Sequence, residues 1–231
     1  MTTCTKSESA SEKNTKKVSE ITLNFTEEIN KLNVCFEDKN IPNILVQLRV
    51  LMKHVNSKPN VRSFRDLQGL KLLVTILIYY TRDYVIQSHM EHSQLISLIV
   101  GILGNCCIQS NLVQSSILSN DTLKCLINIL SDGEIENRGK LWSDVVKLLF
   151  VLKVHKPHHI ELLCELGLVE MLLGAFNRED NKSIMSVIKL FTGLTHSLHI
   201  CVRMIDTSGI TILLEYSHRI EEDSTIIEVS Y

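Results

Sequence analysis

The stretch from Ser97 to Leu130 reads SLIVGILGNCCIQSNLVQSSILSNDTLKCLINIL, and its pattern returns twice further along the chain. Each copy has a long apolar run, a polar break, a short run through a turn, and another apolar run. The later copies are VVKLLFVLKVHKPHHIELLCELGLVEMLLGAF (Val145 to Phe176) and VIKLFTGLTHSLHICVRMIDTSGITILLEY (Val187 to Tyr216). One such unit cannot bury its apolar side alone, whereas a stack of units can. The pattern therefore predicts an all-α fold of stacked helical repeats.

The pattern already begins near Val61, so a further copy precedes the three quoted above. The four copies align on the apolar residue that follows each turn. These residues are Leu70, Leu123, Val169 and Ile210, and their separations are 53, 46 and 41 residues (123−70, 169−123 and 210−169). The excess over the shortest separation falls in the segments 81–91 and 131–140, which we expect to be exposed loops because insertions are tolerated there. The spacing thus predicts one repeating unit with two insertions.

The turns of the copies share residues that tolerate unusual backbone angles. Glycine stands at the turn in three copies, as Gly69, Gly167 and Gly209. A positive φ or a close approach of two helices favours glycine at such a place. The remaining copy has Asn120-Asp121, and asparagine also adopts the left-handed conformation more readily than most residues.

Composition excludes several classes of function. The 231 residues include 24 basic and 26 acidic ones, so the formal net charge is −2. Without a basic excess, binding to nucleic acid has no electrostatic driving force, and we expect no nucleic acid partner. Three prolines and nine glycines are few for strands joined by tight turns, which again favours helices.

Cysteine usage and hydropathy indicate the compartment. The chain has seven cysteines, an odd number without framework spacing, and several lie in apolar helical runs, which is typical of a reducing compartment. Residues 1–20 contain no apolar core for a secretory signal. The apolar stretches Leu70 to Tyr80 and Leu95 to Cys107 are shorter than the roughly 20 residues that span a bilayer. We therefore expect a cytoplasmic protein without a membrane partner.

Three segments follow from composition along the chain. Residues 1–20 are rich in Ser, Thr, Lys and Glu and are expected to be disordered, because they cannot bury enough apolar surface to offset the ordering entropy. Residues 21–218 are predicted to form the repeat domain. Residues 219–231, acidic and then β-branched, are poor helix material and are predicted to be a tail.

The repeat resembles the armadillo family, whose units hold two longer helices and a short one. Leu103-Gly104-Asn105-Cys106 is similar to the first part of the family motif, Leu112 to Leu118 to the middle and Leu123 to Leu130 to the last part. The resemblance covers about residues 40–218 and implies a right-handed α-solenoid of armadillo/HEAT-like repeats. HEAT repeats are the nearest alternative, since the two periods overlap.

A narrower resemblance concerns the armadillo-like half of the tetratricopeptide repeat protein 12 family. The similar blocks are Leu98 to Leu130, Ile188-Lys189-Leu190 and Thr195-His196-Ser197-Leu198-His199. This resemblance implies a cytoplasmic factor in the assembly of ciliary and flagellar dynein arms, with dynein subunits or chaperones as partners.

The armadillo resemblance also implies a protein-binding groove. In family members that bind extended peptides, an asparagine on the third helix of each repeat holds the peptide backbone through its paired donor and acceptor. Asn105 lies at that position, and the alignment places Lys153 and Thr195 there in the next two copies. Together with Gln109, these residues are the predicted groove, and a helix-end cap is the alternative role for Asn105.

No pattern indicates a catalytic, cofactor or metal site. The densest group of possible zinc ligands is His155, His158, His159 and Cys164, but Pro157 places the histidines in a loop between helices. The chain has no phosphate-loop motif and no Gly-x-Ser-x-Gly elbow. We expect adjacent Cys106 and Cys107 to be buried and unreactive. We therefore expect no enzyme activity, no cofactor and no metal.

Two functions remain. In the first, the repeats form an interaction scaffold that holds an extended peptide or a helix of another protein in its groove. In the second, the chain is a structural piece of a longer array that associates end to end or with itself.

Overall fold

The computed structural model describes residues 25–82, 90–131, 138–154, 156–177 and 181–218. Every regular element in these ranges is a helix. The helices group into two compact units, Met1–Ile117 and Leu118–Tyr231. The predicted tails 1–20 and 219–231 lie outside the described residues, as do most of the two predicted loops.

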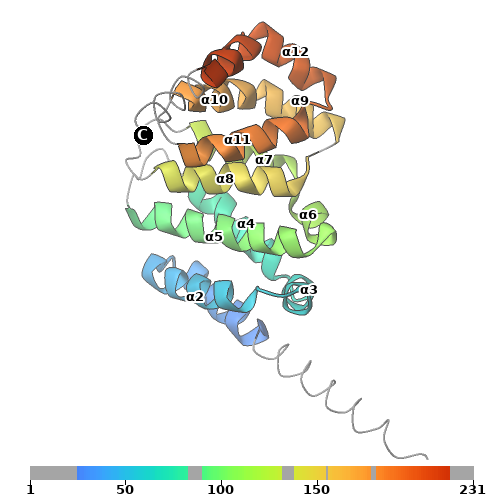
Figure 1. The fold of residues 1–231 in the computed structure, drawn as a ribbon. Helices are drawn as coiled ribbons and strands as arrows, with labels where there is room; N and C mark the ends of the chain where they lie inside the picture. Colours follow the sequence, from blue (N-terminus) through green and yellow to red (C-terminus); the bar gives the residue numbers. More distant parts are fainter. Residues whose placement is uncertain (1–24, 83–89, 132–137, 155, 178–180, 219–231) are drawn as a thin grey trace, which may run out of the picture. The chain divides into compact units, whose positions relative to one another are not determined.

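The first unit is built around its longest helix. It contains a helix at residues 25–37, followed by α2 (Ile41–His54), α3 (Lys58–Asp66), α4 (Gly69–Arg82), α5 (Met90–Gln109) and α6 (Asn111–Ile117). Helix α5 packs against α2, α3, α4 and α6, and α2 runs beside it in Figure 1. Because α5 has neighbours on several sides, most of its apolar residues are buried, which accounts for its apolar sequence.

The second unit contains the two later copies of the repeat. Its elements are α7 (Asn120–Ser131), α8 (Arg138–Leu152), α9 (Pro157–Glu165), α10 (Leu168–Gly174), the short 3₁₀ helix η1 (Ala175–Asn177), α11 (Asn181–Leu194), α12 (Leu198–Asp206) and a helix at residues 209–218. Helices α8 and α11 lie side by side (Figure 1). Helix α12 packs against α9 and α10, and α7 packs against α8, α9 and α10.

Local sequence explains where α2 begins. The Oδ1 atom of Asn40 accepts a hydrogen bond of 3.1 Å from the backbone N–H of Asn43 and so caps the helix. Pro42 occupies the first turn, where its missing N–H has no helical partner to lose. Buried Ile44, Leu45, Leu48 and Leu51 then recur every three or four residues and form the packing face.

The glycines at the turns act in two ways. Gly167 has φ of 80°, the left-handed region that glycine adopts without strain. In the other two copies the positive φ falls one residue earlier, at Gln68 (64°) and Ser208 (56°). Gly209 instead allows close packing, since a Cβ there would lie 3.0 Å from Leu173 Cδ1.

The prediction for Asn120 is wrong. Asn120 begins α7 and is not among the described residues with positive φ. The turn before it is organised by Ser119, whose Oγ atom accepts a hydrogen bond from the backbone N–H of Thr122 at 3.2 Å. A serine N-cap therefore replaces the left-handed residue of the other copies.

Helix α5 is longer than its apolar stretch predicted. Its Glu91–Gln109 part is long and apolar enough, by length and composition alone, to cross a membrane. The length of this helix therefore does not by itself exclude a membrane span, contrary to the prediction from Leu95 to Cys107. Its packing against four helices of the first unit provides another reason for the same composition.

Candidate functional site

The four predicted groove residues lie near the ends of the third helices of their copies. Asn105 is exposed within α5, and Gln109 is the last residue of that helix and half-buried. Lys153 and Thr195 are exposed and lie one residue past the ends of α8 and α11. Asn105 and Gln109 belong to the first unit, and the other two residues belong to the second. Their common role in a groove stays a prediction.

The backbone at the last two positions differs. Lys153 has a φ of 48°, in the left-handed region. The hydroxyl of Thr195 donates a 3.1 Å hydrogen bond to the carbonyl of Thr192. Lys153 and Thr195 therefore lie in helix-ending turns, whereas Asn105 lies inside a helix.

Burial gives a second alignment of the third helices. Buried Val145, Leu148 and Leu149 of α8 match buried Val187, Leu190 and Phe191 of α11 at a constant offset of 42 residues (187−145, 190−148 and 191−149). At the same offset, exposed Lys147 matches exposed Lys189, and exposed Phe150 matches exposed Thr192. Helices α8 and α11 therefore present corresponding positions to solvent.

The same offset continues into α5. Counting back 42 residues from Lys147 and Phe150 gives Asn105 and Ile108 (147−42 and 150−42), and both are exposed. Residue pairs three apart thus recur in each third helix. We call them the third-helix positions: Asn105 with Ile108, Lys147 with Phe150, and Lys189 with Thr192. In the sequence, polar residues recur 42 apart within the apolar runs, at Asn105, Lys147 and Lys189. This recurrence was the signal that could have identified Lys147 and Lys189.

In the second unit these positions form one surface on α8 and α11. Gly193 has no side chain beneath the ring of Phe150, and a Cβ there would lie 4.0 Å from Phe150 Cδ2. The Nζ atom of Lys147 lies 3.6 Å from Asp144 Oδ1 on the same helix. The hydroxyl of Thr192 donates a 2.8 Å hydrogen bond to the carbonyl of Ile188. The surface therefore offers two exposed lysines and an exposed aromatic ring.

Positive charge is concentrated on these helices. Helices α2, α5, α8 and α11 together contain seven Lys and Arg residues but only two acidic residues, Glu91 and Asp144. The whole chain has a net charge of −2. The remaining helices and segments therefore hold an acidic excess. Five of the seven basic residues lie on α8 and α11, with Asp144 as the one acidic residue of these two helices.

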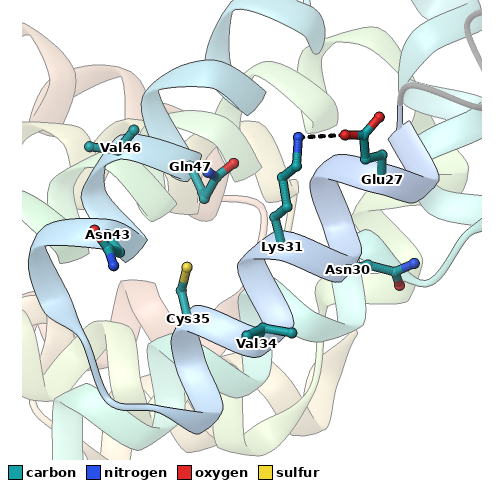
Figure 2. A pocket seen from close by; sticks show the side chains of 8 residues that line it. All are labelled: Glu27, Asn30, Lys31, Val34, Cys35, Asn43, Val46 and Gln47. Atoms are coloured by element: carbon teal, nitrogen blue, oxygen red, sulfur yellow. Dashed lines mark ion pairs between the residues drawn. The ribbon is translucent and has the colours of Figure 1, made fainter.

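A hollow of about 550 Å³ lies between the helix at residues 25–37 and α2 (Figure 2). Its lining consists of Glu27, Asn30, Lys31, Val34, Cys35, Asn43, Val46 and Gln47. Figure 2 shows Lys31 extended toward Glu27, with Nζ 2.7 Å from Oε1. The Lys31 ammonium lowers the pKa of Glu27 below its usual value, so this carboxylate is no candidate for a proton donor near neutral pH.

Adjacent Cys106 and Cys107 are buried, and adjacent His158 and His159 have their rings close together. Burial raises the pKa of Cys106 and of Cys107 to about 12 each, which confirms that this pair is buried and keeps both as thiols. The rings of His158 and His159 are tilted by 58° to each other, with their centroids 4.0 Å apart. No three His, Cys, Asp or Glu side chains gather around a possible metal position in the described part of the chain. His155 lies outside it.

Comparison with solved structures identifies the fold. A designed armadillo repeat protein in complex with the peptide (KR)4 superposes with a TM-score of 0.62 and 13% sequence identity, covering 83% of this chain and 73% of that one. The fold is that of the armadillo repeat. A second designed armadillo repeat protein has a TM-score of 0.63 at 13% identity over 83% of this chain and 73% of its own.

A third solved structure is similar in fold, whereas the sequence comparisons found no match. An engineered protein from a structural genomics consortium matches with a TM-score of 0.63 and 12% identity, over 83% of this chain and 71% of its own. No family model and no curated protein sequence matches the chain. At this sequence identity the likeness shows the all-α armadillo fold alone.

Proposed function

We propose that this chain is a protein-interaction scaffold without catalytic activity, and that its third-helix positions on α8 and α11 hold an acidic, partly apolar segment of another protein. One observation carries the proposal. Lys147 and Phe150 of α8 and Lys189 of the neighbouring helix α11 are all exposed to solvent. Lysines attract carboxylates and fix orientation, whereas a half-exposed aromatic ring provides the apolar anchor that interfaces use.

The charge of the ligand follows from the charge of the helices. The designed armadillo neighbour was solved with a peptide of lysine and arginine. In this chain α8 and α11 together have five basic residues and one acidic residue, so a basic peptide would be repelled. We therefore propose the opposite sign of ligand, bound in extended form or as a helix.

Two peptides of opposite charge test this proposal. Fluorescein-labelled (Glu-Leu)4 and (Lys-Leu)4 are titrated with the full chain, and anisotropy reports binding. We expect (Glu-Leu)4 to bind at least about tenfold more tightly at low salt, and added salt to weaken it because exposed charges are screened. Equal binding of the two peptides would contradict the proposal.

Matched variants locate the site. Lys147→Glu combined with Lys189→Glu is expected to weaken (Glu-Leu)4 at least about tenfold. Lys124→Glu, at an exposed lysine of α7, introduces the same charge elsewhere and is expected to have a much smaller effect. Asn105→Ala combined with Lys153→Ala tests the residues predicted from the family groove. If only this last variant loses binding, the groove follows the predicted residues.

A narrower proposal concerns the cellular process. The three sequence blocks that resemble the tetratricopeptide repeat protein 12 family support a cytoplasmic role in dynein arm assembly. Capture of partners from ciliated cells by the full chain, with the Lys147→Glu and Lys189→Glu variant as control, tests it. Recovery of dynein subunits or chaperones by the unchanged chain alone is the expected result, and their absence from both captures would contradict it.

A further inference from the structure

Gly193, the penultimate residue of α11, is a glycine that the fold of the second unit does not require. Its φ is not positive, since Gly167 is the one glycine with positive φ in the described part of the chain. No close approach of two helices requires it either, because a Cβ at residue 193 would meet one side-chain atom at an ordinary contact distance of 4.0 Å. Within a helix, glycine is less favourable than alanine because its backbone loses more conformational freedom on folding.

The other two third helices have side chains at the corresponding position. Counting back 42 residues from Gly193 gives Val151 of α8, and counting back another 42 gives Gln109 of α5 (193−42 and 151−42). Val151 and Gln109 are half-buried, whereas Gly193 is exposed. A side chain is therefore compatible with this position of a third helix, and α11 differs from the other two helices by lacking one.

The missing side chain leaves space beside the ring of Phe150. The one atom within 4 Å of a Cβ built at residue 193 is Phe150 Cδ2, at 4.0 Å. Phe150 belongs to α8, which packs against α11 (Figure 1), and it is 42% exposed. We call the unfilled space between the backbone of Gly193 and this ring the Gly193 gap.

The lysines of the proposed binding surface are on the same sides of their helices as the residues of the Gly193 gap. Lys189 precedes Gly193 by four residues on α11, and Lys147 precedes Phe150 by three residues on α8. Thr192, next to Gly193, donates its hydroxyl hydrogen bond to a carbonyl of its own helix. An aromatic ring and the glycine backbone therefore border the gap, and the lysines provide positive charge nearby.

We propose that the Gly193 gap takes a large apolar side chain of the acidic segment, such as that of leucine, and that residue 193 sets the size of the side chain that fits. This inference rests on the function proposed above and adds a size requirement to it. An apolar side chain against the Phe150 ring removes apolar surface of both from water. A ligand with only small side chains would cover less of the ring, and a side chain at residue 193 would fill the gap from within the protein.

Two acidic peptides that differ in side-chain size test the proposal. Fluorescein-labelled (Glu-Leu)4 and (Glu-Ala)4 have the same charge and are titrated with the full chain. We expect the unchanged chain to bind (Glu-Leu)4 at least about tenfold more tightly, because more apolar surface is buried. Gly193→Leu fills the gap and is expected to reduce this ratio to below about threefold. Its affinity for (Glu-Ala)4 should change less than about twofold, since both lysines remain.

The comparison of ratios between variants cancels the intrinsic differences between the two peptides, and Gly174→Leu is the matched control. This variant introduces the same side chain at a glycine of α10, where nothing lies within 4 Å of a Cβ, and is expected to keep the ratio of the unchanged chain. Phe150→Ala removes the ring instead of filling the gap and is expected to lower the ratio as well. Circular dichroism and the denaturation midpoint show whether each variant folds, and Phe150→Ala decides alone if Gly193→Leu does not.

The outcomes separate this inference from the function on which it rests. An unaltered ratio in the folded variants Gly193→Leu and Phe150→Ala would overturn the inference, while tighter binding of (Glu-Leu)4 than of (Lys-Leu)4 would leave the proposed function in place. Equal binding of (Glu-Leu)4 and (Glu-Ala)4 by the unchanged chain would overturn the inference in the same way. Equal binding of (Glu-Leu)4 and (Lys-Leu)4 would contradict the proposed function itself, and the inference with it.

Discussion

The first and the last described helix pairs differ in the side chains that they expose to solvent. One pair comes first and the other last among the described helices, and each exposes aliphatic side chains to solvent. In the first pair, Val34 and Val46 stand among polar residues and the Glu27–Lys31 ion pair. In the last pair, five aliphatic residues are exposed, namely Leu198, Val202 and Ile205 of α12 with Ile210 and Leu214 of the helix at residues 209–218. The first pair therefore mixes exposed aliphatic and charged side chains, whereas the exposed side of the last pair is more uniformly aliphatic.

The largest effects test whether both pairs are equally well packed. Leu32 and Ile200 are fully buried, one in each pair. We expect Leu32→Ala and Ile200→Ala each to reduce the free energy of unfolding by about 2–5 kcal/mol, since each leaves a cavity in a packed core. Chemical denaturation measures both. If Ile200→Ala had no effect, the last pair would not be packed as described and its exposed residues would lose their significance.

A smaller effect tests the close approach in the last pair. A Cβ at residue 209 would lie 3.0 Å from both Leu173 Cδ1 and the carbonyl oxygen of Met204. We expect Gly209→Val to destabilise the protein by about 1–3 kcal/mol through overpacking. Gly174→Ala is the control, because nothing lies within 4 Å of a Cβ there. Equal denaturation midpoints for the two variants would mean that Gly209 is not a contact point.

The smallest effect concerns the polar edge of the first pair. The Lys31 side chain lowers the pKa of Glu27, and the Glu27 side chain raises the pKa of Lys31. The contribution of Glu27 to stability is thus present above pH 4.5 and is lost as the pH falls through its lowered pKa. The contribution of Lys31 is present below pH 10.5 and is lost at higher pH.

Both groups are fully exposed, so Glu27→Gln should leave the denaturation midpoint nearly unchanged. NMR titration of the Glu27 carboxyl carbon in the unchanged chain and in Lys31→Gln measures the shift directly. A titration that is identical in the two proteins would show that the pair does not form in solution.

The sequence was sufficient to predict the repeat and its turns. Apolar periodicity and the glycines at 69, 167 and 209 predicted stacked helices, and the designed armadillo neighbours confirm that fold. Asn120 shows the limit at one turn, because a serine cap replaced the expected left-handed residue. Sequence alone does not distinguish these two ways to start a helix, since each needs only a short polar residue.

The surface was predicted less well than the fold. Copies aligned near the helix ends gave Lys153 and Thr195, whereas burial aligned Asn105 with Lys147 and Lys189. Insertions before α5 and α8 change the spacing between turns without changing the exposed sides of the helices. The exposure of one side of α12 was missed for a related reason. The stripe of Leu198, Val202 and Ile205 has the period of a core stripe, and period alone does not say whether a neighbour covers it.

The constant offset of 42 residues between third helices limits how this chain can change in length. Each added residue turns the following part of a helix by about 100°. One residue inserted within α11 before Lys189 would therefore rotate this lysine away from the side that Lys147 shares. Residues added in the segments between helices do not rotate the side chains of the next helix, because the apolar positions of that helix decide which side it exposes. Gain or loss of length is thus compatible with the proposed binding surface only between helices, or in whole repeats.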